Sequence, residues 1–289
     1  MGSTCKIACV QMDCRLADKA ANLRTMLARL TEAAGQGVGL VIFPECALTG
    51  YCYDSKPDAL ARAEPVPGPS VEAFAGICKE LNTHAVYGLL ERDGDRLFNA
   101  LALVGPDGLV GSYRKIHLPF LGVDRFATPG DRPFQVHDLG GLKVGLSICY
   151  DGSFPETARV LTLLGADLIV LPTNWPEAAI CSAKYGGNTR ALENHVYYAA
   201  VNRVGHEGGF HFIGMSRIID YGGNTITGSD GDEETILYAE INPAKARRKH
   251  TIVIPGKHEI DRIGDRRPEM YGPIVANNRG PRNREGGSA

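Results

Sequence analysis

KVGLSIC at residues 143–149 and ADLIVLP at residues 166–172 are two apolar runs of strand length. Runs of this length that end at a turn or a proline are typical of buried β-strands. The residues between them, near 154–164, carry a helical pattern. A strand, a helix and a second strand in this order predict an α/β fold with parallel strands.

The first half of the chain shows the same order of elements. Residues 6–12 (KIACVQM) resemble the run at 143–149, and residues 38–44 (VGLVIFP) resemble the run at 166–172. Apolar residues recur at helical spacing in the segment between the two early runs, as expected of an amphipathic helix. We therefore expect two pseudo-symmetric halves, each built around its own sheet.

Further elements follow from apolar patterns and from the turn residues that bound them. We expect a helix at residues 71–81 and strands at 85–91, 99–104, 197–202 and 210–219. Residues 276–289 are rich in Gly, Asn and Arg and contain almost no apolar side chains. Such a segment cannot bury enough apolar surface to fold, so we expect an extended or disordered tail after residue 275.

Composition and charge exclude several classes of function. The chain has 289 residues and nearly balanced charge, with 31 Lys and Arg against 33 Asp and Glu. This balance argues against a nucleic-acid partner. No apolar run approaches the roughly 20 residues that span a bilayer, and the first residues lack the pattern of a secretory signal. We therefore expect a cytoplasmic protein without a membrane partner.

The eight cysteines predict thiols rather than a disulfide framework, because disulfides are rare in cytosolic chains of this size. No CxxC or HExxH pattern is present, which argues against a zinc site. We expect no metal and no cofactor.

Three residues that carry chemistry follow predicted strands. Glu45 comes directly after residues 38–44, Cys149 ends the run at 143–149, and Lys115 ends a third apolar segment. Taken alone, such residues are most often a turn carboxylate, a core thiol and a surface charge. Catalytic groups of α/β sheets gather where strands end at their carboxyl edge, so the three together are candidates for one active site.

At these residues the sequence resembles the nitrilase superfamily of carbon–nitrogen hydrolases. The resemblance covers roughly residues 5 to 275 and depends on several segments in the family's order and spacing. The segments are Phe43-Pro44-Glu45, Tyr113-Arg114-Lys115-Ile116-His117-Leu118-Pro119, Pro129-Gly130-Asp131, Cys149-Tyr150-Asp151, Phe154-Pro155-Glu156 with Arg159, Leu171-Pro172, and Arg267-Pro268 with Tyr271.

The resemblance implies a four-layer α-β-β-α sandwich, with residues 1–275 as one carbon–nitrogen hydrolase domain. It also implies that two chains pair through one helical face, which gives a homodimer or a higher homo-oligomer. The implied reaction cleaves a small carboxamide to an acid and ammonia through a cysteine thioester.

The resemblance assigns a role to each of the three residues, and the roles suit their chemistry. Cys149 attacks the carbonyl carbon, since the thiolate is the nucleophilic form of cysteine. Glu45 takes the thiol proton, passes it to the leaving amine and then activates water. Lys115 stabilises the oxyanion, with help from the backbone N–H of Tyr150. A neighbouring ammonium also favours the thiolate.

One position departs from the family pattern. Many members carry a second active-site glutamate between the lysine and cysteine segments, and the usual register places it at Val123. Asp124 is the residue after Val123, and its side chain is one methylene shorter than that of glutamate. We expect Asp124 to replace that glutamate through a local shift of the loop. The alternative is that Asp124 only pairs with Arg125.

The substrate is less well defined by the sequence. Tyr51, Tyr150, Asn174 and Trp175 lie just past strand ends and are candidates for substrate binding. The pair Tyr150-Asp151 after the cysteine is similar to amidase-like branches, whereas true nitrilases usually carry Trp-Glu there, so nitrile hydrolysis is disfavoured. His117 is structural in the family pattern and is not assigned a catalytic role.

Three other functions remain open. An N-carbamoyl amine or amino acid hydrolase would use the same residues and release carbon dioxide as well as ammonia. An ammonia-supplying amidase subunit would need a separate synthetase partner. An inactive homologue would serve as a scaffold, although the intact Glu45, Lys115 and Cys149 argue against it.

Overall fold

The computed structural model describes residues 4–277. The chain divides into two compact units, of which the first ends at Arg248 and the second begins at Lys249. The predicted tail at 276–289 lies outside the described residues except for Ala276 and Asn277. The extent of the hydrolase domain to residue 275 stays a prediction.

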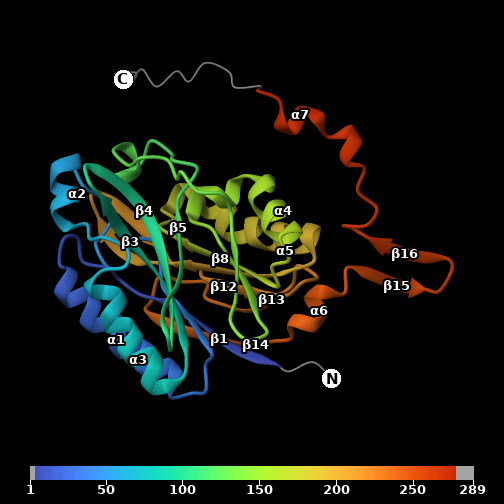
Figure 1. Cartoon of the computed structure of the whole chain (residues 1–289), viewed down its shortest axis with the longest axis horizontal. Helices are drawn as coiled ribbons and strands as arrows, with labels where there is room; N and C mark the ends of the chain where they lie inside the picture. Colours follow the sequence, from blue (N-terminus) through green and yellow to red (C-terminus); the bar gives the residue numbers. More distant parts are fainter. Residues whose placement is uncertain (1–3, 278–289) are drawn as a thin grey trace. The chain divides into compact units, whose positions relative to one another are not determined.

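The first unit contains two six-stranded sheets (Figure 1). In spatial order, the first sheet consists of β14 (Thr235–Ile241), β1 (Cys5–Gln11), β2 (Leu40–Ile42), β3 (His84–Asp93), β4 (Arg96–Gly105) and β5 (Gly108–Arg114). The second consists, again in spatial order, of β13 (Thr225–Gly228), β12 (Arg217–Ile219), β9 (Tyr197–Asn202), β8 (Leu168–Thr173), β7 (Lys143–Leu146) and β6 (Val136–Asp138).

The two sheets have the same topology, which confirms the predicted pseudo-symmetry. In the first, β1, β2 and β3 are parallel, and antiparallel strands flank them on both sides. In the second, β7, β8 and β9 are parallel and are flanked in the same way. The resemblance between residues 6–12 and 143–149 therefore reflects equivalent strands, β1 and β7.

Four helices complete the layers. In Figure 1, α1 (Lys19–Ala34) and α3 (Pro69–Leu81) lie on one side of the paired sheets, and α4 (Pro155–Leu163) and α5 (Gly187–Asn194) lie on the other. The side chains of β1 alternate between two cores. Ile7 and Cys9 face the core between the sheets, whereas Ala8 and Val10 face the core beneath α1 and α3. This alternation follows from the period of two in a strand and confirms the four-layer α-β-β-α sandwich.

The remaining elements are short. In the first unit they are α2 (Lys56–Arg62), η1 (Gly122–Arg125), η2 (Cys149–Ser153), η3 (Glu177–Ala179), η4 (Ser182–Gly186), β10 (Val204–Glu207), β11 (Phe210–Ile213) and α6 (Pro243–Arg247). In the second unit they are β15 (His250–Ile254), β16 (His258–Asp261), η5 (Pro268–Met270) and α7 (Gly272–Val275).

The strand expected at residues 210–219 was wrong in one respect. It divides into β11 and β12, which belong to different sheets. Gly214 and Met215 separate them, with φ of 61° and 59°. Because two successive residues with positive φ cannot continue a strand, the chain turns there and enters the second six-stranded sheet.

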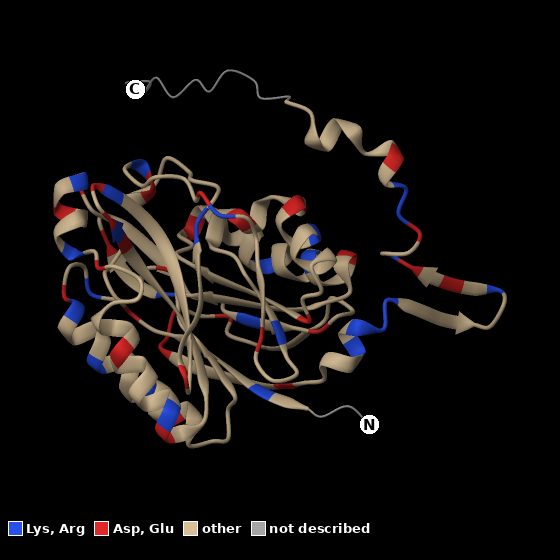
Figure 2. Ribbon diagram, viewed as in Figure 1, with Lys and Arg blue, Asp and Glu red and all other residues tan. Residues whose placement is uncertain are grey.

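No helix within residues 4–277 is long and apolar enough to cross a membrane. Figure 2 shows basic and acidic residues intermixed along the elements of the first unit.

Candidate active site

The three candidate catalytic residues follow strands that end at corresponding edges of the two sheets. Glu45 comes three residues after β2, Lys115 comes directly after β5, and Cys149 begins the turn η2 after β7. β3 is parallel to β2, and β4 is antiparallel to both β3 and β5. The β5 strand therefore runs in the same direction as β2. Carboxyl ends of strands with one direction meet at one edge, which brings Glu45 and Lys115 together.

Cys149 occupies a strained position in the backbone. Its φ is +44°, in the left-handed region that non-glycine residues rarely adopt. The residue is partly exposed and packs against the core between the sheets and against the core beneath α4 and α5. A sharp turn that presents a nucleophile in this way is a form of strain found at functional sites.

Glu45 is held in place by a close approach between its segment and β3. The N–H of Gly88 donates to Pro44 O at 3.2 Å, and Leu48 N–H donates to Gly88 O at 3.1 Å. A Cβ on Gly88 would lie 2.3 Å from Cys46 N and 2.6 Å from Pro44 O. Only glycine allows this approach, so Gly88 positions the Glu45 segment.

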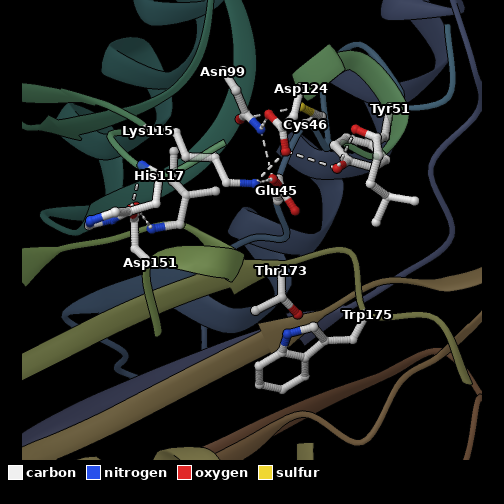
Figure 3. A network of polar contacts seen from close by, with 12 residues as sticks. Glu45, Cys46, Tyr51, Asn99, Lys115, His117, Asp124, Asp151, Thr173 and Trp175 are labelled. Carbon is white, nitrogen blue, oxygen red and sulfur yellow. Dashed lines mark hydrogen bonds and ion pairs between the residues drawn. The ribbon is translucent and has the colours of Figure 1, made fainter. Parts of the chain in front are cut away.

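A fully buried ion-pair network connects Glu45, Lys115 and Asp124 (Figure 3). Lys115 Nζ lies 2.7 Å from Glu45 Oε1 and 2.6 Å from Asp124 Oδ2. Asp124 lies in η1 and is 2% exposed. It does not pair with Arg125, which donates to the backbone oxygens of Gly122 and Tyr53 instead. The geometry therefore places a second carboxylate beside the lysine.

Two neutral side chains complete the network. Asn99 Nδ2 donates to Glu45 Oε1 at 2.7 Å and to Asp124 Oδ1 at 2.9 Å. Tyr51 OH donates to Asp124 Oδ2 at 2.9 Å. A Cβ on Gly122 would lie 2.2 Å from the Tyr51 ring, so this glycine lets η1 pack against the tyrosine. Each carboxylate is thus fixed by a charged donor and at least one neutral donor.

The pKa values of the buried network move in directions set by burial and charge. Burial raises the pKa of the Glu45 carboxyl and Asp124 raises it further, while Lys115 and Asn99 act in the opposite direction. Burial alone would lower the pKa of Lys115, but Asp124 and Glu45 raise it well above its ordinary value. Lys115 is therefore an ammonium at neutral pH.

The pKa of the Cys149 thiol is raised well above its ordinary value. Burial is the largest cause, and Glu45 adds to it, while Lys115 and the backbone N–H of Asn174 lower the pKa. The neighbouring ammonium favours the thiolate, as expected, but burial and the carboxylate outweigh it. The resting cysteine is therefore a neutral thiol and needs a base before it can attack.

Two buried polar groups beside Cys149 have unused hydrogen-bonding capacity. Within residues 4–277, Glu45 Oε2 has no hydrogen-bond partner, although Oε1 of the same carboxylate has two. Both side-chain polar atoms of Asn174 also lack a partner among the described residues, and the residue is 1% exposed. Because unpaired buried polar atoms are costly, they are expected to contact a bound molecule.

The four candidate substrate-binding residues lie in different surroundings in the structure. Trp175 lines a cavity beside Cys149. Asn174 is buried, and its backbone N–H is close enough to the Cys149 thiol to lower the pKa of that thiol. Tyr51 is buried and contacts Asp124. Tyr150 is 39% exposed, and its ring packs edge-on against Phe154.

Sequence reasoning missed Asn99, Gly88 and the structural role of Asp151. Asn99 lies within β4, where a buried polar residue between apolar neighbours was the available signal. Asp151 Oδ2 accepts hydrogen bonds from Tyr113 OH at 2.8 Å and from Ile148 N at 3.0 Å. Within the described ranges, no group of three or more His, Cys, Asp or Glu side chains is arranged to hold a metal ion.

Comparison with known proteins agrees with this geometry. The model of the carbon–nitrogen hydrolase family matches residues 6–250. A protein named nitrilase from Pyrococcus abyssi is 38% identical, over 92% of this chain and 98% of its own length. An omega-amidase from Mus musculus is 32% identical, over 84% of this chain and 90% of its own length.

The fold is also shared with an amidase of known structure from Nesterenkonia sp. AN1. One structure of that amidase, a mutant with the acetamide moiety of fluoroacetamide added covalently at the active-site cysteine, has a TM-score of 0.77 and 25% identity. The match covers 93% of this chain and 95% of that chain. The chain belongs to the carbon–nitrogen hydrolase family, in the amidase-like branch of the nitrilase superfamily, and is an amidase-type hydrolase.

Proposed function

We propose that the protein hydrolyses a small primary carboxamide to a carboxylic acid and ammonia through a thioester on Cys149. One observation carries the proposal. Glu45 presents an oxygen, Oε2, that has no partner within the described residues, and the charge of Glu45 raises the pKa of the Cys149 thiol. A buried carboxylate oxygen next to a neutral thiol is suited to take its proton.

The first half of the reaction forms the thioester. Glu45 accepts the thiol proton while Cys149 Sγ bonds to the carbonyl carbon, and the carbonyl oxygen becomes an oxyanion. An ammonium has three N–H donors, and Lys115 gives one each to Glu45 and Asp124. The third is available to the oxyanion. The carbon–nitrogen bond then breaks as Glu45 returns the proton to the nitrogen, and ammonia leaves.

The second half regenerates the enzyme. Glu45 takes a proton from water, whose oxygen bonds to the thioester carbon, and the carbon–sulfur bond breaks. The thiolate recovers a proton from Glu45, and the acid departs. Asp124 and Asn99 hold Lys115 and Glu45 in place throughout, because both bond directly to this pair.

The substrate amide needs partners of its own. Asn174 offers an acceptor and two donors beside the thiol, and both of its polar atoms lack partners within residues 4–277. We assign the amide group of the substrate to Asn174 and to Glu45 Oε2, and the oxyanion to Lys115 with the backbone N–H of Tyr150. Trp175 contributes a wall of the cavity next to the reacting carbon.

The test is ammonia release from primary amides, N-carbamoyl compounds and nitriles. We expect ammonia from amides with the wild type and none with Cys149→Ala. Cys5→Ala is the matched control, because Cys5 is a half-buried thiol in β1, and it should keep wild-type rates. Incubation with fluoroacetamide should add mass at Cys149 alone.

Other outcomes would change the assignment. Activity on N-carbamoyl compounds alone, with carbon dioxide released, would indicate the N-carbamoyl hydrolase. Activity on nitriles alone would place the protein with its relative named nitrilase. If no compound of the panel releases ammonia and Cys149 stays unlabelled, the protein is an inactive homologue.

We also propose that the protein is a homodimer that pairs through α4 and α5. The two helices pack against each other. Four large apolar side chains on these helices or directly after α4 are at least 38% exposed, namely Val160, Leu163, Leu164 and Leu192. Clustered apolar side chains on a monomer surface mark sites of association.

A further inference from the structure

A cavity of about 400 Å³ opens on one side of Cys149. Its walls come from the turn after β7, the end of β8, the segment at 175–190 and β9. None of Glu45, Lys115 and Asp124 lines it. Cys149 is therefore the residue that this cavity shares with the candidate active site, while the proposed proton-transfer groups lie outside its lining.

This placement separates the two parts of an amide substrate. The nitrogen must lie toward Glu45, which exchanges protons with it in the proposed reaction. The group on the other side of the carbonyl carbon then points away from the network, into the cavity. The lining of the cavity should therefore match the chemistry of the acyl group.

The lining is largely apolar and aromatic. Leu171, Trp175 and Tyr198 form buried walls, each 6% exposed or less, and Tyr185 lies at the rim with 64% exposure. Pockets with this lining gain affinity by removing apolar ligand surface from water. A volume of this size lies in the lower part of the range of about 300–1,000 Å³ for small-molecule sites.

The cavity offers no unengaged positive charge for a carboxylate on the substrate. Arg190 is the single charged side chain among its lining residues. Its charge is already paired with Glu193 at 3.0 Å, and three of its five N–H groups donate to Gly152 O, Glu193 Oε1 and Ser153 O. A carboxylate placed here would lose water and would have to share the Arg190 charge with Glu193, which makes its burial costly.

We infer that the substrate is the amide of an uncharged acid and that its apolar or aromatic acyl group occupies the cavity beside Trp175 and Tyr198. This inference rests on the proposed amide hydrolysis for its orientation. The inferred preference differs from that of an enzyme whose amide substrate carries a charged carboxylate at the far end of the acyl chain.

The first test compares two amides of similar shape. In 4-methylpentanamide an isopropyl group replaces the carboxylate of succinamate. We expect kcat/KM for 4-methylpentanamide to exceed that for succinamate by about tenfold or more. Along unbranched amides from acetamide upward, kcat/KM should rise about fourfold per methylene until the cavity is filled. Equal or faster hydrolysis of succinamate would overturn the inference.

The second test narrows the cavity. Gly186 lines it with φ of −58° and ψ of −56°, and a Cβ there would meet only Ser182 Cβ, at 4.0 Å. Gly186→Val should lower kcat/KM for phenylacetamide at least tenfold and leave acetamide within about threefold. Gly76→Val, in an exposed and open position on α3, is the control and should change neither. An equal loss for both amides would contradict occupancy of the cavity.

A third measurement tests occupancy of the cavity independently of the proposed amide hydrolysis. Trp175 is the only tryptophan in the chain, so intrinsic fluorescence reports on the cavity. In Cys149→Ala, 4-methylpentanamide should change the emission at concentrations where succinamate does not. Binding without ammonia release from the wild type would reject the amidase reaction and retain the cavity assignment. No fluorescence change with any uncharged amide would reject the cavity assignment itself.

Discussion

Asp151 holds His117 through a single carboxylate oxygen: Oδ1 accepts the backbone N–H at 3.1 Å and lies 2.7 Å from ring Nδ1. Asp151 belongs to the turn that begins at Cys149, whereas His117 lies two residues after Lys115. The contact therefore joins the segment of the nucleophile to the segment of the ammonium. These segments extend from different sheets, so their spacing depends on such a connection.

Asp151→Asn should lower turnover by disturbing this connection. Oδ2 of the aspartate accepts from Tyr113 OH and Ile148 N, so an amide nitrogen there would face a backbone donor. An unsatisfied buried donor costs about 1–3 kcal/mol. We expect kcat to fall at least tenfold with KM within about threefold, and the melting temperature to drop.

Asp107→Asn is the control for that variant, because Asp107 is exposed in the turn between β4 and β5. It should match the wild type in both measurements. A lowered melting temperature with unchanged kcat at 25 °C would show that Asp151 supports the fold and does not position the site.

The pH dependence of kcat/KM should reflect the raised pKa of Glu45. The reaction needs the carboxylate, and burial raises its pKa above the ordinary value of 4.5. As pH falls through the raised pKa, Glu45 becomes protonated and can no longer take the thiol proton. The rate should therefore fall on the acid side at a midpoint above 4.5.

On the alkaline side we expect a plateau through pH 9. The pKa values of Cys149 and Lys115 are raised above 9.0 and 10.5, so neither group titrates earlier. Steady-state rates from pH 4 to 10 at constant ionic strength, with circular dichroism to monitor folding, give the profile. A rate that rises with thiol ionisation near pH 9 would indicate that the free thiolate, without a base, is the nucleophile.

Asp124→Asn tests the second carboxylate. The change leaves Lys115 with one carboxylate partner, and breaking a buried ion pair costs about 3 kcal/mol or more. We expect the free energy of unfolding to fall by about this amount, measured by urea denaturation, and kcat to fall at least tenfold. Asp124→Glu keeps the charge and should retain more activity than Asp124→Asn.

Asp131→Asn is the control for Asp124→Asn, because it removes a carboxylate from an ion pair at the surface. Asp131 is 37% exposed and pairs with Arg96 and Arg114, so its loss should cost less than about 1 kcal/mol. Equal effects of the two aspartate-to-asparagine changes would show that burial does not strengthen the Asp124 pair.

The sequence predicted the parts of the site that depend on strand ends, and it missed those that depend on contacts across the sheet. Glu45 and Lys115 were recognisable because each follows an apolar run. Asn99 was not, because its importance comes from carboxylates 54 and 25 residues away along the chain. The network of neutral donors depends on tertiary packing, which no local pattern encodes.

The fold shows the same division. Strand β9 at Tyr197–Asn202 was predicted with the bounds that the structure has, because all six of its residues are buried. The break between β11 and β12 was missed, since Gly214 is one of 35 glycines and Met215 gives no sign of positive φ. Local patterns predict buried strands well and fail where two neighbouring strands join different sheets.

The proposed dimer face gives a final prediction. Leu164 directly follows α4 and is 51% exposed, and Leu192 on the neighbouring α5 is 44% exposed. A glutamate at each would put charges into the apolar interface, where burial without a partner is costly. We expect the double variant Leu164→Glu, Leu192→Glu to sediment as a monomer when the wild type sediments as a dimer. Val110→Glu, a 40% exposed apolar position on β5, should stay dimeric. A double variant that remains dimeric would move the interface to another face, and a wild type that sediments as a monomer would remove the dimer from the proposal.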